Sequence, residues 1–146
     1  MIASRPSARV AGAAARGDDR PVSWTKTNLS DVRDVSPAGS AMRWRMTRGV
    51  VGSTQVGLSR FTFEPGARMP FGHRHRVQEE VYLVVGGSGV FKLDDELVDV
   101  VAGDVVRVGP ETMRAYAAGP DGLDLVCVGG TRPKGNDTER DPDFWG

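Results

Sequence analysis

Apolar and polar residues alternate in short runs along most of this chain, and turn-forming residues separate the runs. A period of two residues is typical of β-strands with one buried face. On this basis strands are predicted at residues 24–26, 42–46, 55–64, 73–75, 80–85, 90–93, 97–100, 103–108, 113–118 and 123–128. The pattern therefore predicts an all-β domain that is rich in hairpins and poor in helix.

Clusters of Gly, Pro and Asp mark the turns between these runs. We expect the sequence Gly-Gly-Ser-Gly at residues 86–89 to reverse the chain, and residues 118–122 to form the last turn of the domain. Residues 94–96, Asp-Asp-Glu, lie between two apolar runs and predict a hairpin turn.

The length of 146 residues is that of a single domain with a modest core. Residues 1–20 have no acidic residue before Asp18 and no apolar core of a secretory signal, and we expect a disordered tail there. The folded domain is expected over residues 21–130. Residues 131–146 are polar and extended, yet they end in Phe144–Trp145, and these aromatics are expected to pack on the domain or on a second subunit.

Charge and cysteine content exclude several classes of partner. The 19 basic and 19 acidic residues balance, so the chain has no electrostatic footprint for nucleic acid or for an anionic membrane. No stretch approaches the roughly 20 apolar residues of a membrane span. The single cysteine, Cys127, lies in a strand-like run and is interpreted as a core residue. We therefore expect a cytoplasmic protein without a disulfide.

The chemistry of the chain is concentrated in one short segment. Both histidines of the protein, His73 and His75, lie here, and Glu79 and Glu80 follow them. Side chains at positions i and i+2 of a strand share a face, about 6–7 Å apart along the backbone, so the two imidazoles can converge on one ion. Two nitrogen ligands and one carboxylate oxygen suit iron, manganese, nickel or zinc.

The surroundings of this segment resemble the first motif of the cupin superfamily. Gly66, His73, His75, Glu80 and Gly87 fill that motif, with a spacer after Gly66 that is one residue longer than the family pattern. The spacing selects Glu80 as the third ligand, and Glu79 is then expected to face solvent because adjacent strand residues point to opposite faces. The resemblance implies a double-stranded β-helix, or jelly-roll, barrel that carries a metal inside.

The second cupin motif departs from the family pattern. It begins normally with Gly103–Asp104 and an apolar strand, but the position of the family's histidine falls on Arg114. No third histidine exists in the chain, so no shift of register restores the fourth metal ligand. An arginine stays protonated at ordinary pH and does not bind a cation.

Arg114 has two interpretations. In the first, a metal is held by His73, His75 and Glu80, and Arg114 binds an anionic ligand through its planar guanidinium. In the second, the guanidinium takes the electrostatic place of the metal and pairs with Glu80 inside a metal-free barrel. Strand parity adds Tyr82 and Tyr116 as residues that contact a ligand or fill the barrel.

Three classes of function remain open from the sequence. The first is a small-molecule-binding cupin with a His73–His75–Glu80 metal site and an anionic ligand. The second is a metal-free binding or regulatory barrel in which the Glu80–Arg114 pair is structural. The third is a partner-binding barrel that uses Phe144–Trp145. The family resemblance also implies a homodimer formed through the outer sheet. Whether the protein is an enzyme does not follow, because this architecture supports many activities.

Overall fold

The computed structural model of the chain describes residues 24–146. The tail predicted at residues 1–20 lies outside the described residues. The elements in chain order are a 3₁₀ turn Leu29–Asp31, β1 Met42–Met46, α1 Arg48–Val51, β2 Gly57–Phe63, β3 Gly72–His75, β4 Glu80–Leu93, β5 Glu96–Val101, β6 Val105–Val108, β7 Arg114–Gly129 and β8 Thr138–Asp141. The prediction of an all-β domain with little helix is confirmed.

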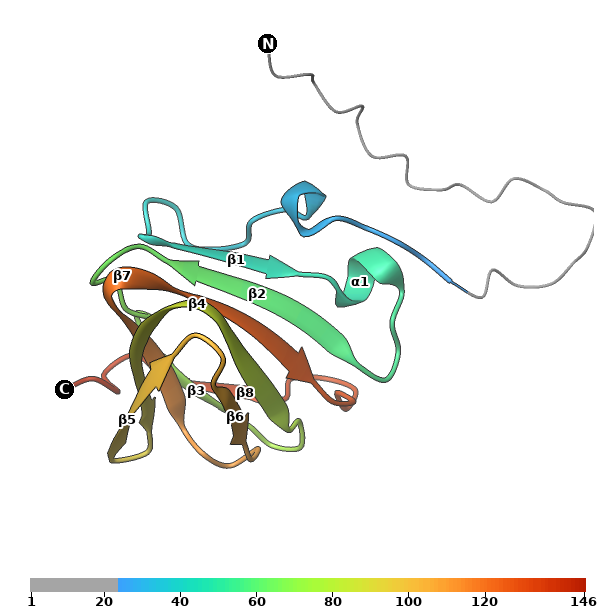
Figure 1. Cartoon of the computed structure of the whole chain (residues 1–146). Coiled ribbons are helices and arrows are strands. Elements are labelled where there is room, and N and C mark those ends of the chain that lie inside the picture. The colour runs from blue at the N-terminus through green and yellow to red at the C-terminus, as the bar shows by residue number, and fades with distance from the viewer. Residues whose placement is uncertain (1–23) are drawn as a thin grey trace, which may run out of the picture.

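The strands form one curled antiparallel sheet, a jelly-roll barrel, as Figure 1 shows. The long strand β7 is its centre, because β7 pairs with β2, β3 and β4. β1 continues the sheet beyond β2, and β5 and β6 pair with β4. Within residues 24–146, no helix is long and apolar enough to cross a membrane.

Two of the predicted turns are wrong. Residues 86–89 lie within β4, and residues 118–122 lie within β7, where the two strands continue side by side with register shifts near Gly86 and Gly89. The backbone of Gly87 has a positive φ of 73° and packs directly against Gly122. The glycines therefore allow two long strands to bend past each other, which is the role of a β-bulge rather than of a chain reversal.

Of two further local predictions, the hairpin and the first strand, the structure confirms one and contradicts the other. The hairpin at residues 94–96 is confirmed, since Leu93 pairs with Glu96 and Asp94 adopts the left-handed conformation of a tight turn. The strand predicted at residues 24–26 is wrong, because that segment is irregular and its Thr25 hydroxyl only donates to the Val51 carbonyl. A short exposed segment without a pairing partner gains too little to form a strand.

The core lies inside the barrel and is dominated by aromatic side chains. Tyr82, Phe91 and Tyr116 are completely buried, and their rings contact one another at centroid distances of 4.7 to 5.5 Å. Cys127 is also buried, and burial raises the pKa of its thiol well above the usual value. The prediction that Cys127 is a core residue is confirmed.

The C-terminal segment packs on its own barrel. β8 pairs with β3, so that His73 lies opposite Arg140 and His75 lies opposite Thr138. Phe144 fills the space above Gly72, which has no side chain, and the Trp145 indole donates a hydrogen bond of 2.8 Å to the Met69 carbonyl. Residues 131–146 therefore contribute a strand to the sheet and cover the strand that carries both histidines.

Candidate functional site

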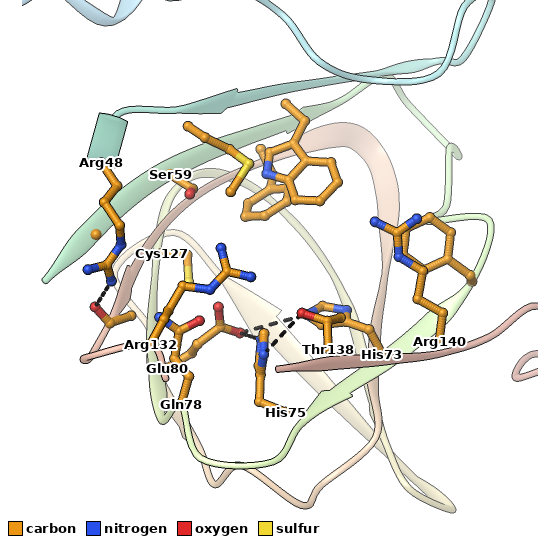
Figure 2. Close-up of a pocket in the computed structure, with 16 residues that line it drawn as sticks. Arg48, Ser59, His73, His75, Gln78, Glu80, Cys127, Arg132, Thr138 and Arg140 are labelled. Carbon is orange, nitrogen blue, oxygen red and sulfur yellow. Dashed lines mark hydrogen bonds and ion pairs between the residues drawn. The ribbon is translucent and has the colours of Figure 1, made fainter. Parts of the chain in front are cut away.

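A cavity of about 200 Å³ opens into the barrel beside β3, and Figure 2 shows its polar side chains. One wall is apolar. The lining residues are Trp44, Met46, Arg48, Gly57, Ser59, Phe61, Phe71, His73, His75, Gln78, Glu80, Cys127, Gly129, Arg132, Thr138 and Arg140. The three residues that the sequence selected as metal ligands therefore face the same cavity.

β3 and the start of β4 bring the metal-ligand candidates together. His73 and His75 point to the same side of β3 with their ring centroids 5.4 Å apart, while Arg74 between them is exposed. Donor atoms of His73, His75 and Glu80 all lie within 4.8 Å of one another. Glu79 faces solvent and pairs with Arg107, as the alternation predicted. The cluster is a suitable set of ligands for one divalent metal ion.

Glu80 is the electrostatic centre of the cluster. Its Oε2 atom lies 3.7 Å from His73 Nε2, 3.4 Å from His75 Nε2 and 3.5 Å from Arg114 Nη2, and it accepts a hydrogen bond from the Tyr82 hydroxyl. Burial alone would raise the pKa of Glu80, but its close contacts with His73 and His75 and the hydrogen bond from Tyr82 outweigh burial and hold that pKa far below its usual value. Glu80 is thus an anion at any ordinary pH.

The histidines have the properties of metal ligands. His75 Nδ1 lies 3.3 Å from the carboxylate of Asp137, which is 1% exposed, and His75 Nε2 is buried without a hydrogen-bond partner within the described residues. A carboxylate on one ring nitrogen fixes the tautomer that leaves the other nitrogen free to bind a metal. Burial lowers the pKa of His73, which favours the neutral form that a metal requires. The residues present therefore fit a divalent metal.

Arg114 lies behind the pocket wall. It pairs with His73 across β3 and β7, it is fully buried, and it is absent from the pocket lining. Its guanidinium donates to the carbonyl oxygens of His73, Gly109, Pro110 and Thr112 at 3.0 to 3.4 Å. Most of its hydrogen-bonding capacity is therefore used by the protein itself.

Tyr82 and Tyr116 are also fully buried and also absent from the pocket lining. The Tyr116 hydroxyl donates to the Tyr82 hydroxyl, which donates to Glu80. Burial raises the pKa of both tyrosines well above the usual value, so both hydroxyls keep their protons. The two side chains support Glu80 from inside the barrel.

Several residues of the site were missed from the sequence. Asp137 orients His75, and Arg132, Thr138 and Arg140 line the cavity. All four belong to the segment that the sequence presented as a polar tail. The one signal in the sequence for Asp137 was that a buried His75 needs a hydrogen-bond partner for Nδ1. Nothing in the local sequence identifies which carboxylate is that partner.

Comparisons with known proteins agree with the geometry. The family model of the cupin domain matches residues 59–129. An uncharacterized protein of Methanocaldococcus jannaschii is 38% identical over 40 residues, and the match spans 27% of this chain and about a third, 32%, of that protein.

Two solved structures share the fold. A cupin protein from Bacteroides fragilis has 25% identity and a TM-score of 0.58, covering 73% of this chain and 89% of that one. A sugar phosphate isomerase of the cupin superfamily from Silicibacter pomeroyi has 22% identity and a TM-score of 0.62, covering 74% of this chain and 76% of that one. With the matched domain and the barrel in agreement, the chain belongs to the cupin superfamily.

Proposed function

We propose that this protein is a metal-dependent, small-molecule-binding cupin in which His73, His75 and Glu80 hold a divalent transition metal. One observation carries the proposal: buried His75 Nε2 has no hydrogen-bond partner in the described chain and faces Glu80 within the cavity. An unpaired polar atom in a buried site is costly unless a ligand satisfies it. Iron, manganese, nickel and zinc all suit this ligand set.

The cavity supplies the place for a small molecule. It is lined by the metal-ligand candidates on one side and by Trp44, Phe61 and Phe71 on another, which is the usual composition of a ligand pocket. When bound, the metal would polarise a carbonyl or phosphoryl oxygen of that molecule. The similar sugar phosphate isomerase supports a small polar molecule as the occupant.

We assign Arg114 an internal role in this proposal. Its guanidinium contacts four carbonyl oxygens and one carboxylate, and it does not line the cavity. A dication and a guanidinium repel, but the Glu80 carboxylate is the anion that both would contact. Arg114 therefore balances the charge of Glu80 and fixes the loop at residues 109–112. In this proposal the arginines that line the pocket, rather than Arg114, bind the ligand.

The same contact supports a second candidate function. The Glu80–Arg114 pair at 3.5 Å, together with the contacts of both histidines to Glu80, satisfies much of the cluster without any ion. In this case the protein is a metal-free binding or regulatory barrel. The two candidates differ in metal content, which a single experiment measures.

The experiment is elemental analysis by mass spectrometry of untagged protein prepared without chelator and then supplied with iron, manganese, nickel or zinc. Near-stoichiometric metal is expected in the wild type and in Glu79→Gln, and its loss is expected in Glu80→Gln and His73→Ala. Glu79 is a matched control because it neighbours Glu80 and faces solvent. Wild-type protein that takes up none of the four metals would establish the metal-free barrel.

We further propose that the protein is a homodimer that pairs through the outer face of its sheet. Exposed apolar side chains meet there, since Leu83 lies beside Val105 and Val81 lies beside Val128. Such a row is costly to leave in water. Leu83→Lys is expected to give monomers in analytical ultracentrifugation, whereas Leu97→Lys, exposed elsewhere on β5, should leave the dimer intact. A wild type that is monomeric at high concentration contradicts this proposal.

A further inference from the structure

Positive charge surrounds the cavity. Among the described residues that line it, Arg48, Arg132 and Arg140 are cations and Glu80 is the one carboxylate. Glu80 is already balanced by Arg114 when no metal is present, and a bound dication would make the floor of the cavity positive. The cavity therefore attracts anions whether or not it holds a metal.

The three arginines differ in what they already bind. Arg48 donates to the carbonyl oxygens of Gly130 at 2.7 Å, of Thr54 at 3.2 Å and of Gly129 at 3.4 Å, so it joins α1 to the end of β7. Arg132 and Arg140 are exposed, and neither has a carboxylate within ion-pair distance among residues 24–146. These two guanidinium groups keep their donors for a ligand.

The positions of Arg132 and Arg140 are set by the C-terminal segment. Arg140 lies on β8 opposite His73, and its guanidinium stacks on Phe71 at 4.6 Å from the ring centroid. This cation–π contact orients the planar group without using its N–H donors. Figure 2 shows Arg140 on one side of the cavity and Arg132 reaching toward the cluster from another.

The remaining wall is apolar and flat. Trp44 stacks on Phe61 with ring centroids 5.3 Å apart and an interplanar angle of 28°, and both line the cavity. Phe71 lies on the same cavity, beneath Arg140. A ligand that satisfies this surface has an apolar part as well as its charge.

We propose that Arg132 and Arg140 bind the oxyanion of the ligand, a carboxylate or a phosphate, and that the apolar part of the same molecule packs on Trp44 and Phe71. This inference rests on the proposed function only in taking the cavity as the ligand site. It concerns side chains other than the metal ligands, so the test of anion binding can succeed or fail independently of the test of metal binding.

The test uses benzoate and phenyl phosphate as charged probes and benzamide as the neutral counterpart of benzoate, each titrated by calorimetry into the full chain. Saturable binding is expected for at least one charged probe, with benzamide weaker by about tenfold or more, since charge-assisted hydrogen bonds are lost. The stronger charged probe identifies the oxyanion.

Variants locate the binding. Arg132→Ala and Arg140→Ala are each expected to weaken the charged probe by about tenfold, the effect of losing a charge-assisted bond. Arg107→Ala is the matched control, because Arg107 is an exposed strand arginine that does not line the cavity. The affinity of this variant for the charged probe should stay at the wild-type value. Failure of both charged probes to bind, equal binding of benzamide, or unchanged affinity in both pocket variants overturns the inference.

The same titrations are run on Glu80→Gln and on metal-loaded wild type. Charged probes that bind wild type without metal, and lose affinity in Arg132→Ala, support the anion site even if elemental analysis finds no metal. Conversely, a protein that binds metal stoichiometrically but none of the charged probes retains the metal site and loses the anion site.

Discussion

The two sides of Glu80 contain different kinds of polar group, although both approach the same carboxylate oxygen. On the histidine side, His73 and His75 line a cavity and His75 Nε2 has no hydrogen-bond partner in the described chain. On the arginine side, the Arg114 guanidinium is fully buried, and its two terminal nitrogens donate to four backbone carbonyls while Nε is left unpaired within the described residues. A group that is kept for a ligand faces the cavity with unused bonding capacity, whereas a structural group has no access to the cavity and uses most of its bonding capacity within the protein.

The largest expected effect is on the arginine side. Arg114→Met removes the buried cation, so Glu80 loses its cationic partner and several carbonyl oxygens lose a donor. Removing one partner of a buried ion pair costs about 3–5 kcal/mol. We therefore expect the free energy of unfolding, measured in urea by tryptophan fluorescence, to fall by about that amount.

Two further variants show whether this loss comes from the pair. Arg107→Met removes an exposed ion pair to Glu79 and should cost about 1 kcal/mol or less. Glu80→Gln added to Arg114→Met removes the uncompensated charge and should restore part of the stability. A loss in Arg114→Met no larger than in Arg107→Met would mean that the arginine side is not structural.

The next effect concerns the histidine side, where Asp137 is predicted to act through His75. Asp137→Asn replaces a charged acceptor of His75 Nδ1 with an amide, and loss of such a partner lowers metal affinity by about 10–100-fold. Competition with a chromogenic chelator measures that affinity. Glu139→Gln is the matched control, because Glu139 lies two residues along the chain and pairs with exposed Arg74.

Asp137 also accepts hydrogen bonds from the backbone N–H groups of Val77 and Gln78, so Asp137→Asn will lower stability as well. Affinity is therefore compared at a temperature where the metal-free variant is fully folded by circular dichroism. Unchanged affinity under that condition would show that Asp137 only supports the loop, and that the orientation of His75 comes from elsewhere.

The different success of sequence reasoning on the two sides has a physical cause. His73, His75 and Glu80 lie within eight residues. Strand alternation lets only one of Glu79 and Glu80 join them, and the spacing of the cupin motif selects Glu80. Asp137 meets His75 only because β8 pairs with β3, a contact between distant segments that no local pattern encodes. Counting along the second motif placed Arg114 at the position of the family's histidine, and the structure shows that this position pairs with His73. Its engagement with carbonyls depends on the path of the 109–112 loop and did not follow.

The same limit explains the errors in the fold. A run of glycines is equally compatible with a tight turn and with a bulge, and the difference lies in what faces it. Gly87 meets Gly122 in the structure, so each glycine sequence allows the other strand to approach closely. Outside residues 24–26, the alternation that predicted the strands was reliable because it reports burial of one face, which is set residue by residue.

The smallest expected effect lies on the pair of tyrosines that support Glu80 from within the core. Tyr116→Phe removes one buried hydrogen bond, to the Tyr82 hydroxyl, and should lower the free energy of unfolding by about 1 kcal/mol. Tyr82→Phe should cost more, about 1–3 kcal/mol, since Glu80 loses a donor and the Tyr116 hydroxyl loses its partner. The double variant should cost less than Tyr82→Phe, because it also removes the Tyr116 hydroxyl that Tyr82→Phe leaves buried and unpaired. Neither side chain lines the cavity, so affinity for the charged probes should stay at the wild-type value in all three variants. Additive losses of stability would show that the two hydroxyls act independently rather than as one hydrogen-bonded chain. A tenfold loss of probe affinity would place the hydroxyls on the ligand side of Glu80 rather than on its structural side.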